Sequence, residues 1–297
     1  MPELPEVETV VRGLTKHIVG QTIKDVQILH KKSFLWPAKF GKQPPKIIGL
    51  KITDIARRGK GIIISLSQDT TLLIHLKMTG QLIYISRSRI KPRMTRQEMR
   101  VNFGHPTDDF SNAMPSRHTR VIIKLSQGTL YFNDQRIFGW VKASPTAMLA
   151  DDKFLKQLGP EPWDITAEEL AQKIKRRAKS PIKAILLDQS VMVGLGNIYV
   201  DEALFAAGVR PTRQGKTITA KDAAGLLVAT QSVLTKGIKY SGTSIINYKT
   251  PDGSPGRMQN HLMVYMQNKA PCKKCGGPIS KIRLAGRGTH FCCTCQR

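Results

Sequence analysis

The amino-acid sequence predicts an α+β protein with more than one domain, because the pattern of apolar residues changes three times along the chain. A helical pattern opens the chain, and short β-branched segments with polar or glycine breaks follow it to about residue 142. From about residue 146 the apolar residues recur with helical spacing. The tail from residue 270 reads as a cysteine-rich hairpin. With 297 residues, the chain is long enough for two domains.

The charge balance points to a polyanionic partner. Lys and Arg number 47 and Asp and Glu number 21, which gives a net charge of +26. So large an excess of positive charge destabilises a compact chain by self-repulsion unless a polyanion neutralises it. Nucleic acid is the usual polyanion. No apolar run approaches the roughly 18 residues of a membrane span, and no secretory signal opens the chain. We therefore expect a cytoplasmic, nucleoid-associated protein without a membrane partner, whose cysteines stay reduced.

The opening helix is expected over residues 5–19, ending at Gly20. Its apolar positions fall at helical spacing, namely Val7, Val10, Val11, Leu14 and Ile18. Three acidic residues stand near its start, where the helix dipole is positive: Glu3, Glu6 and Glu8.

The region from about residue 22 to 142 is expected to form a β-sandwich or barrel, because many short strands follow one another without helices. The expected strands are 23–28, 47–55, 62–66, 70–76, 82–85, 121–125 and 129–132. The stretch 86–118 is irregular and basic. It is either a mobile arm that binds DNA or a solvated loop.

Four helical segments are expected after the β region, over residues 146–158, 167–188, 197–207 and 220–236. Between the first two, residues 158–163 contain one glycine and two prolines, which is typical of an interdomain linker.

The cysteines of the tail predict a zinc site. Cys272 and Cys275 form one C-x2-C pair, and Cys292 and Cys295 form a second pair sixteen residues later. Two pairs at this separation give four thiolates in a tetrahedron, with no open position for a substrate. We therefore expect one structural zinc ion that stabilises a hairpin too small for its own core. Cys293 is expected to be a bystander, because only Cys292 keeps the two-residue gap to Cys295.

The glycine-rich stretch 193–199 is not a dinucleotide motif, because Tyr199 occupies the third glycine position and no βαβ pattern surrounds it. No nucleotide cofactor is expected. We interpret the stretch as a turn between helices in which Asn197 caps the second helix, either as a plain cap or with free N–H groups facing an anion. Arg287, flanked by glycines at the hairpin tip, either enters a DNA groove or is an ordinary solvated turn residue.

The first residues could supply a nucleophile. The chain begins Met-Pro-Glu, and removal of the initiator methionine before a small residue would leave Pro2 with a free amine. An α-amino group has a pKa of about 8, so part of it is neutral near pH 7 and can attack a sugar carbon to form an iminium. Glu3 is adjacent and could move protons. The alternative is that the proline and the glutamates only open a helix.

Taken together, these stretches resemble the formamidopyrimidine-DNA glycosylase (Fpg) family. The resemblance rests on residues 1–9 (MPELPEVET), 75–80 (HLKMTG), 134–139 (DQRIFG), 193–199 (VGLGNIY) and the cysteine finger. These motifs occur in the family's order over nearly the whole chain.

The resemblance implies a role for each matching residue. Pro2 would be the nucleophile, Glu3 the general acid and base, Glu6 a supporting residue, and Lys60 a contact to the phosphate beside the lesion. The residues expected at the DNA are His75, Met78, Arg136, Phe138, Asn197 and Arg287. Met78, Arg136 and Phe138 would fill the space of the extruded base, whereas Asn197 and Arg287 would hold phosphates. Pattern alone would make Met78 and Phe138 core residues.

The resemblance also implies the architecture and the partner. It implies a catalytic domain over residues 1–145, with the N-terminal helix and a two-layered β-sandwich, and a helix–two-turn–helix domain over 146–240. A lesion-covering region over 241–268 and the zinc finger over 269–297 would complete the chain. The expected activity is bifunctional glycosylase and AP lyase on oxidised purines in double-stranded DNA, by a monomer.

Two departures from the family pattern bear on lesion preference. Gln135 and Ile137 stand in a motif that usually reads DPRRFG, and Arg257 and Met258 stand where aromatics are common. Two alternatives remain open. One is an endonuclease VIII-like enzyme for oxidised pyrimidines, whose start usually has glycine in place of Leu4. The other is a catalytically silent protein that binds damaged DNA.

Overall fold

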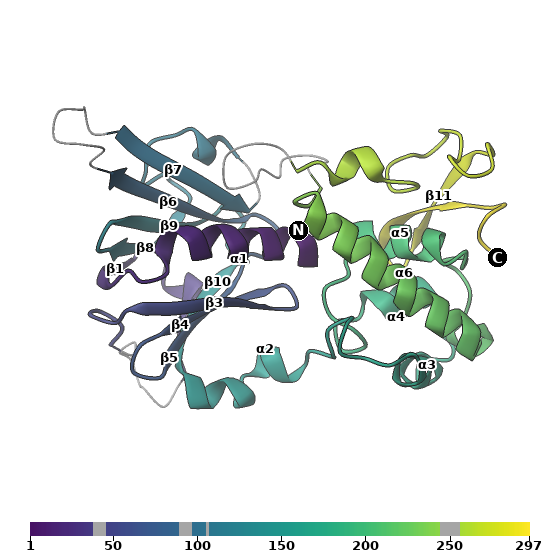
Figure 1. Ribbon diagram of the computed structural model, residues 1–297, viewed down its shortest axis with the longest axis horizontal. Coiled ribbons are helices and arrows are strands. Elements are labelled where there is room, and N and C mark those ends of the chain that lie inside the picture. Colours follow the sequence, from purple (N-terminus) through teal and green to yellow (C-terminus); the bar gives the residue numbers. More distant parts are fainter. Residues whose placement is uncertain (38–45, 89–96, 105–106, 244–255) are drawn as a thin grey trace. The chain divides into compact units, whose positions relative to one another are not determined.

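The structure is a computed structural model that describes residues 1–37, 46–88, 97–104, 107–243 and 256–297, and it divides into two compact units (Figure 1). Unit 1 comprises Met1–Pro2, Glu6–Asp152 and Ser241–Gly256, and unit 2 comprises Glu3–Pro5, Lys153–Tyr240 and Arg257–Arg297. The expected linker 158–163 belongs to unit 2. There Gly159 N donates to Gln189 O over 2.8 Å.

Unit 1 is built around α1 (Leu4–Ile18) and two five-stranded sheets. The first sheet has the order β1 (Ile23–Ile28), β8 (Thr119–Leu125), β9 (Gly128–Asp134), β6 (Gly80–Ser88) and β7 (Gln97–Gly104). The second has the order β2 (Phe34–Leu35), β10 (Trp140–Pro145), β5 (Thr70–His75), β4 (Gly61–Leu66) and β3 (Ile52–Arg58). Among the described strands of unit 1, the pair β2–β10 is parallel and the others are antiparallel.

One apolar core joins both sheets and the helix, which confirms the predicted sandwich. Figure 1 shows α1 running along the sandwich between the two sheets. Val10 and Leu14 of α1 are fully buried in the same cluster as Ile64 of the second sheet and Phe103 and Phe132 of the first. Burying these faces against each other is what holds the layers together.

Two strand predictions are corrected. The stretch 86–118 is not irregular throughout, because β7 pairs with β6 and buries Val101 and Phe103 on alternate positions. Residues 89–96 and 105–106 of that stretch lie outside the described residues. The expected strand 47–55 begins only at Ile52, since Gly49 before it has φ +91°, a left-handed conformation outside the β region.

Unit 2 is helical and ends in a hairpin. Its helices are α2 (Lys153–Lys156), α3 (Ala167–Lys175), α4 (Ile182–Leu187), α5 (Asn197–Ala206) and α6 (Ala220–Lys239), and its hairpin is β11 (Ile279–Leu284) with β12 (Arg287–Cys292). The single helix predicted over 167–188 is wrong, because Pro181 stands at the start of α4 and cannot continue the helical hydrogen bonds. The predicted helix 146–158 is a 3-10 helix, Thr146–Asp151, followed by the single turn of α2.

No described helix combines the length and the apolarity that crossing a bilayer requires.

Candidate functional site

The N-terminus of α5 holds the Glu3 carboxylate. Gly196 N donates to Glu3 Oε2 over 2.6 Å, and Ile198 N donates to Oε1 over 2.9 Å. Tyr199 N also donates to Oε2, over 3.3 Å. The first N–H groups of a helix lack intrahelical acceptors and carry the positive end of the dipole, so they stabilise a charged carboxylate. The anion at this helix start is therefore a side chain of the protein itself.

The glycines before α5 make room for that carboxylate. Gly194 has φ +98°, and a Cβ there would lie 2.4 Å from Leu4 Cδ1. A Cβ on Gly196 would lie 2.3 Å from the carboxylate carbon of Glu3. Leu4 N also donates to Gly194 O over 3.1 Å. The turn is glycine-rich because residues from the start of the chain pass directly against its backbone.

The prediction that Asn197 caps α5 is wrong. The N-cap is Gly196, and Asn197 is the first residue of the helix. Its side chain instead donates through Nδ2 to Gly288 O over 3.0 Å, next to the hairpin tip. The expected phosphate contacts Asn197 and Arg287 are thus joined through the backbone of β12.

Pro2 and Glu6 are both buried. Pro2 directly precedes Glu3 in the chain. The Glu6 carboxylate accepts from Thr243 N over 2.8 Å and from the Thr243 hydroxyl over 3.1 Å. Thr243 belongs to the expected lesion-covering region 241–268, of which residues 244–255 lie outside the described residues.

Lys60 occupies the tight turn between β3 and β4 and is 6% exposed. Arg57 fixes this turn, because its guanidinium donates to Gly59 O over 3.1 Å and to Glu8 Oε2 over 3.0 Å. Burial raises the pKa of Glu8, but hydrogen bonds from Arg12 and Arg57 outweigh it and lower that pKa. Glu8 therefore stays ionised and holds the turn from α1.

His75, at the end of β5, is buried and neutral at physiological pH. Burial lowers its pKa to about 3, and the charges of Lys77 and Lys60 add to the effect. Its Nδ1 accepts from Lys77 N over 3.0 Å, and its ring lies 5.9 Å from the Trp140 ring. His75 can therefore offer a hydrogen bond but does not add a positive charge at pH 7.

A buried carboxylate organises the loop between β9 and β10. Asp134 Oδ2 accepts from Gly139 N over 2.6 Å, and Oδ1 accepts from Arg136 N over 3.2 Å. The two side chains expected at DNA project from this loop. Phe138 is 54% exposed, and the Arg136 guanidinium lies 4.9 Å from the centre of its ring.

Thr79 joins this loop to the turn that carries Met78. Its hydroxyl donates to Asp134 Oδ1 and accepts from Arg136 N over 3.2 Å. Met78 is half-buried on that turn. The structure thus brings Met78, Arg136 and Phe138 to two linked turns of unit 1.

The four paired cysteines converge on one site. The sulfur atoms of Cys272, Cys275, Cys292 and Cys295 all lie within 4.8 Å of one another. Burial and the neighbouring thiols raise the pKa of Cys295 to about 12, because crowded thiolates repel without a cation. Cys293 points elsewhere, with its sulfur 3.2 Å from the Ser280 hydroxyl. The four sulfurs fit one tetrahedral zinc ion, which would be structural.

Sequence reasoning missed a buried ion pair behind the hairpin tip. Lys183 is fully buried and its Nζ lies 2.7 Å from Asp201 Oδ1 and 3.1 Å from Gly288 O. Asp201 Oδ2 in turn accepts from His290 N over 2.9 Å. The sequence feature that could have revealed this ion pair is a lysine within an apolar helical stretch. Lys183 and Asn197 together fix the same carbonyl beside Arg287.

Comparison with known proteins decides the family. Three family models match, described as the Formamidopyrimidine-DNA glycosylase N-terminal domain (residues 1–141), the Formamidopyrimidine-DNA glycosylase H2TH domain (158–249) and the zinc finger found in FPG and IleRS (270–297). Formamidopyrimidine-DNA glycosylase of Desulfitobacterium hafniense is 38% identical over the full length of both chains. The chain belongs to the formamidopyrimidine-DNA glycosylase family.

Solved structures agree with this assignment. A Lactococcus lactis Fpg mutant bound to DNA with a Fapy-dG lesion aligns over all of both chains with a TM-score of 0.83 at 34% identity. The wild-type L. lactis Fpg in complex with an oxidised-pyrimidine DNA aligns over the same coverage with a TM-score of 0.81. This chain is accordingly a DNA-repair glycosylase of the Fpg type, with a zinc finger built from its four paired cysteines.

The expected Fpg site residues are divided between the two units. Unit 1 contains Pro2, Glu6, Lys60, His75, Met78, Arg136 and Phe138. Unit 2 contains Glu3, Asn197, Arg287 and the four zinc ligands. The peptide bond between Pro2 and Glu3 therefore joins the expected nucleophile of one unit to the expected proton carrier of the other.

Proposed function

We propose that this Fpg family member is a bifunctional glycosylase and AP lyase that excises 8-oxoguanine and formamidopyrimidines from double-stranded DNA in base excision repair. The observation that carries the proposal is that the Glu3 carboxylate is buried and held by three backbone N–H groups, and that Glu3 directly follows Pro2 in the chain. A buried acid with an adjacent amine is the pair that nucleophilic chemistry at a sugar carbon needs.

The chemistry begins with the Pro2 nitrogen once Met1 is removed. Its lone pair forms a bond to C1′ of the damaged nucleotide as the bond from C1′ to the base breaks, and the base leaves with that electron pair and takes up a proton. The attacking nitrogen then loses its proton, and opening of the sugar ring turns the C1′–N bond into an iminium while O4′ takes up a proton and becomes a hydroxyl. The iminium acidifies C2′, so loss of a C2′ proton expels the 3′ phosphate, and a second elimination expels the 5′ phosphate.

Glu3 is the proposed proton carrier in these steps, with Glu6 in support. Three N–H donors fix the Glu3 oxygens, so the carboxylate needs little reorganisation when it gives or takes a proton. The Thr243 contacts fix Glu6 in the same way. Lys60 is proposed to contact the phosphate beside the lesion.

Extruding the damaged base costs a few kcal/mol, and we propose that the linked turns of unit 1 recover part of it. Phe138 and Met78 would replace the lost stacking, and Arg136 would contact the base or phosphates left behind. Asp134 holds the loop so that Phe138 stays exposed in the free protein. His75, Asn197 and Arg287 are proposed as further contacts to DNA.

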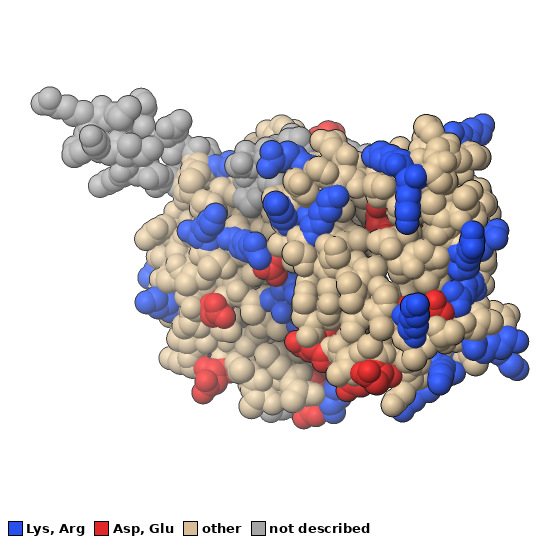
Figure 2. Space-filling view, turned by 45° about the vertical axis from the view of Figure 1, so that its right-hand side comes forward, with Lys and Arg blue, Asp and Glu red and all other residues tan. Residues whose placement is uncertain are grey.

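We further propose that the protein acts as a nucleoid-associated monomer without a nucleotide cofactor, and that its domains follow residues 1–145, 146–240, 241–268 and 269–297. The blue Lys and Arg side chains spread over the face in Figure 2, with the red acidic side chains in fewer places, fit a protein that follows DNA.

Borohydride trapping tests the proposal. Borohydride reduces an iminium and leaves the protein covalently joined to DNA, so the wild type should form an adduct on a duplex with 8-oxoguanine opposite cytosine. Pro2→Gly should form far less. Absence of an adduct for the wild type would contradict the mechanism and support the catalytically silent alternative. Equal trapping by the variant would show that the Pro2 ring nitrogen is not the nucleophile.

The second candidate substrate class is oxidised pyrimidines, because an L. lactis relative was solved with such a DNA. The same trapping reaction on thymine glycol duplexes separates the two classes. Faster excision of 8-oxoguanine supports the purine assignment, and faster excision of thymine glycol supports the endonuclease VIII-like alternative.

A further inference from the structure

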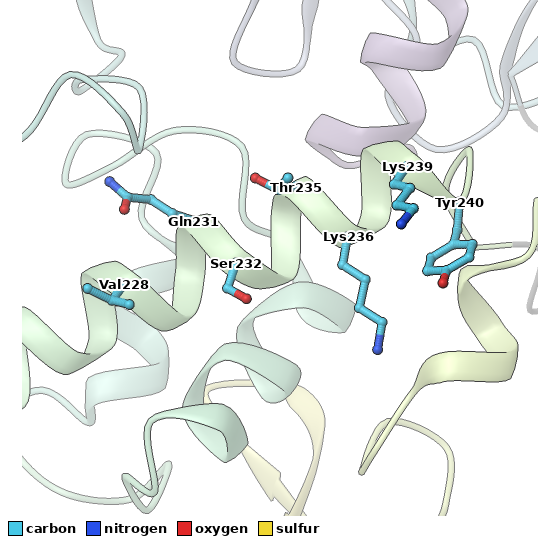
Figure 3. A pocket seen from close by; sticks show the side chains of 7 residues that line it. All are labelled: Val228, Gln231, Ser232, Thr235, Lys236, Lys239 and Tyr240. Carbon is cyan, nitrogen blue, oxygen red and sulfur yellow. The ribbon is translucent and has the colours of Figure 1, made fainter.

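The end of α6 carries a basic surface that the proposed lesion chemistry does not use. It consists of Lys236, Lys239, Tyr240, Arg257, His261 and Lys273, and is called the α6 patch below. Lys236, Lys239 and Tyr240 line a shallow hollow of about 520 Å³, which Val228 and Ser232 continue along the helix. Figure 3 shows these side chains along α6. All of these residues belong to unit 2.

Helical spacing puts this surface on the solvent side of α6. The exposed positions Val228, Ser232, Lys236 and Lys239 recur every three or four residues, whereas Leu234 between them is fully buried. Val228 is 66% exposed, so the hollow has an apolar end as well as a basic one.

Cations crowd the patch. Lys236, Arg257 and Lys273 are all exposed. Burial lowers the pKa of His261, and the nearby charges of these three residues lower it further. Over the part of the chain that the structure describes, Lys236, Lys239 and Arg257 form no ion pair. Their mutual repulsion is relieved when a polyanion binds.

Two rings provide a flat surface among these cations. Tyr240 and His261 stack with their centroids 3.9 Å apart and their planes 24° from parallel, and both are half-buried. Lys239 Nζ lies 6.0 Å from the centre of the Tyr240 ring. Protein surfaces that bind nucleic acid combine cations along the phosphate backbone with aromatic rings on which bases can stack.

We propose that the α6 patch binds the phosphodiester backbone of nucleic acid in addition to the contacts assigned to the lesion. Its Arg257 and His261 also belong to the proposed lesion-covering region 241–268, whereas Lys236, Lys239 and Tyr240 do not. The lesion-site residues Lys60, Arg136, Asn197 and Arg287 lie outside it. The phosphates come either from the duplex flanking the lesion or from a second strand, and the patch recognises the same chemistry in both. The inference does not depend on the catalytic mechanism.

The double variant Lys236→Gln/Lys239→Gln tests the patch, with Lys216→Gln/Lys221→Gln as a matched control. The control also removes two exposed charges from unit 2, near the other end of α6. Glutamine keeps a good helix propensity, so α6 should stay folded, which circular dichroism checks.

The measurement is the affinity for undamaged duplex at several salt concentrations. Each phosphate contact contributes about 0.9 to the slope of log affinity against log salt, so the patch variant should lose about one to two units of slope. The control should keep the wild-type slope. Equal slopes for wild type and patch variant, or an equal loss in the control, would overturn the proposal.

Two further arms identify the source of the phosphates. In the first, a duplex with a stable abasic-site analogue is extended by one helical turn on each side, and the gain in affinity is compared between wild type and patch variant. In the second, the complex with the short duplex is titrated with a labelled single strand. A loss specific to the patch variant in either arm supports the proposal and names the source, whereas no specific loss in both arms contradicts it.

The stacked rings give a separate readout. Tyr240→Leu keeps the charges of the patch and removes one of the two stacked rings. If a single strand is the ligand, this variant should weaken single-strand binding severalfold and leave duplex binding unchanged.

Discussion

Two backbone turns, one in each unit, are organised by a buried carboxylate that accepts main-chain N–H groups. In unit 1, Asp134 accepts from Arg136 N and Gly139 N in the loop after β9. In unit 2, Glu3 accepts from Gly196 N and Ile198 N at the start of α5. The local physics is the same, because a carboxylate satisfies several donors that the turn leaves unpaired.

The two turns differ in whether the turn or the carboxylate is the functional part. The Asp134 carboxylate comes from the strand next to its loop and serves the loop, which then presents Arg136 and Phe138 to solvent. The Glu3 carboxylate comes from the far end of the chain and is itself the proposed functional group. The same set of hydrogen bonds can therefore fix either the turn or the carboxylate, and substitutions should separate the two uses.

The largest effect is expected for Glu3→Gln. An amide cannot take up a proton in the same way, so excision should slow by about 10²–10⁴-fold, the usual contribution of a general acid or base. Affinity for duplex with a stable abasic-site analogue should remain close to the wild type. Single-turnover excision and equilibrium binding measure the two quantities.

Glu168→Gln is the matched control for that variant, because Glu168 is an exposed acid in the first turn of α3. If Glu3→Gln and Glu168→Gln excise at the same rate, Glu3 is only a helix cap.

Asp134→Asn should mainly reduce the stability of the fold. The amide leaves a buried N–H of the loop without its charged acceptor, which should reduce the free energy of unfolding by about 1–3 kcal/mol. Urea unfolding measures the change, and Asp54→Asn on an exposed position of β3 is the control. Equal unfolding midpoints for the two variants would show that Asp134 does not organise the loop.

His75, which lies against the Asp134 loop at Gly139, should make folding sensitive to acid. Its pKa is about 3 in the folded protein and about 6.5 when unfolded, so the unfolded chain binds the extra proton between these values. Stability should therefore fall as pH drops below about 6.5, by about 2 kcal/mol between pH 7 and 5. Unfolding at both pH values measures it, and His75→Gln should lose most of this dependence whereas His30→Gln keeps it.

Phe138→Ala should have the smallest effect on folding, since an exposed side chain contributes within about 0.5 kcal/mol. Affinity for damaged duplex should nevertheless fall, because the side chain that replaces stacking is lost. Leu29→Ala is the control, since Leu29 is also an exposed apolar residue. If the two variants bind damaged duplex equally, Phe138 is not inserted.

Sequence patterns predicted the elements that depend on neighbouring residues. Helix α1, strand β4 and helix α5 appear within one residue of their expected bounds, because local periodicity determines them. The zinc ligands were found for the same reason, since each pair sits on one turn. The break at Pro181 was also visible in the sequence and was overlooked in favour of the long apolar pattern.

Contacts between distant residues could not be predicted in this way. Glu3 and Gly196 are 193 positions apart, and nothing in the pattern around either residue names the other. The same holds for Glu6 with Thr243 and for Lys183 with Gly288, which depend on how whole elements pack. The family resemblance supplied candidate roles for Glu3 and Glu6 but not the donors that hold them.

The most direct test of the central claim is to locate the bond between protein and DNA. After borohydride reduction on 8-oxoguanine duplex, proteolysis and mass spectrometry should find the deoxyribose fragment on the peptide that begins at Pro2, attached to its nitrogen. A fragment attached to Lys60 or to any other side chain, with Pro2 unmodified, would contradict the account.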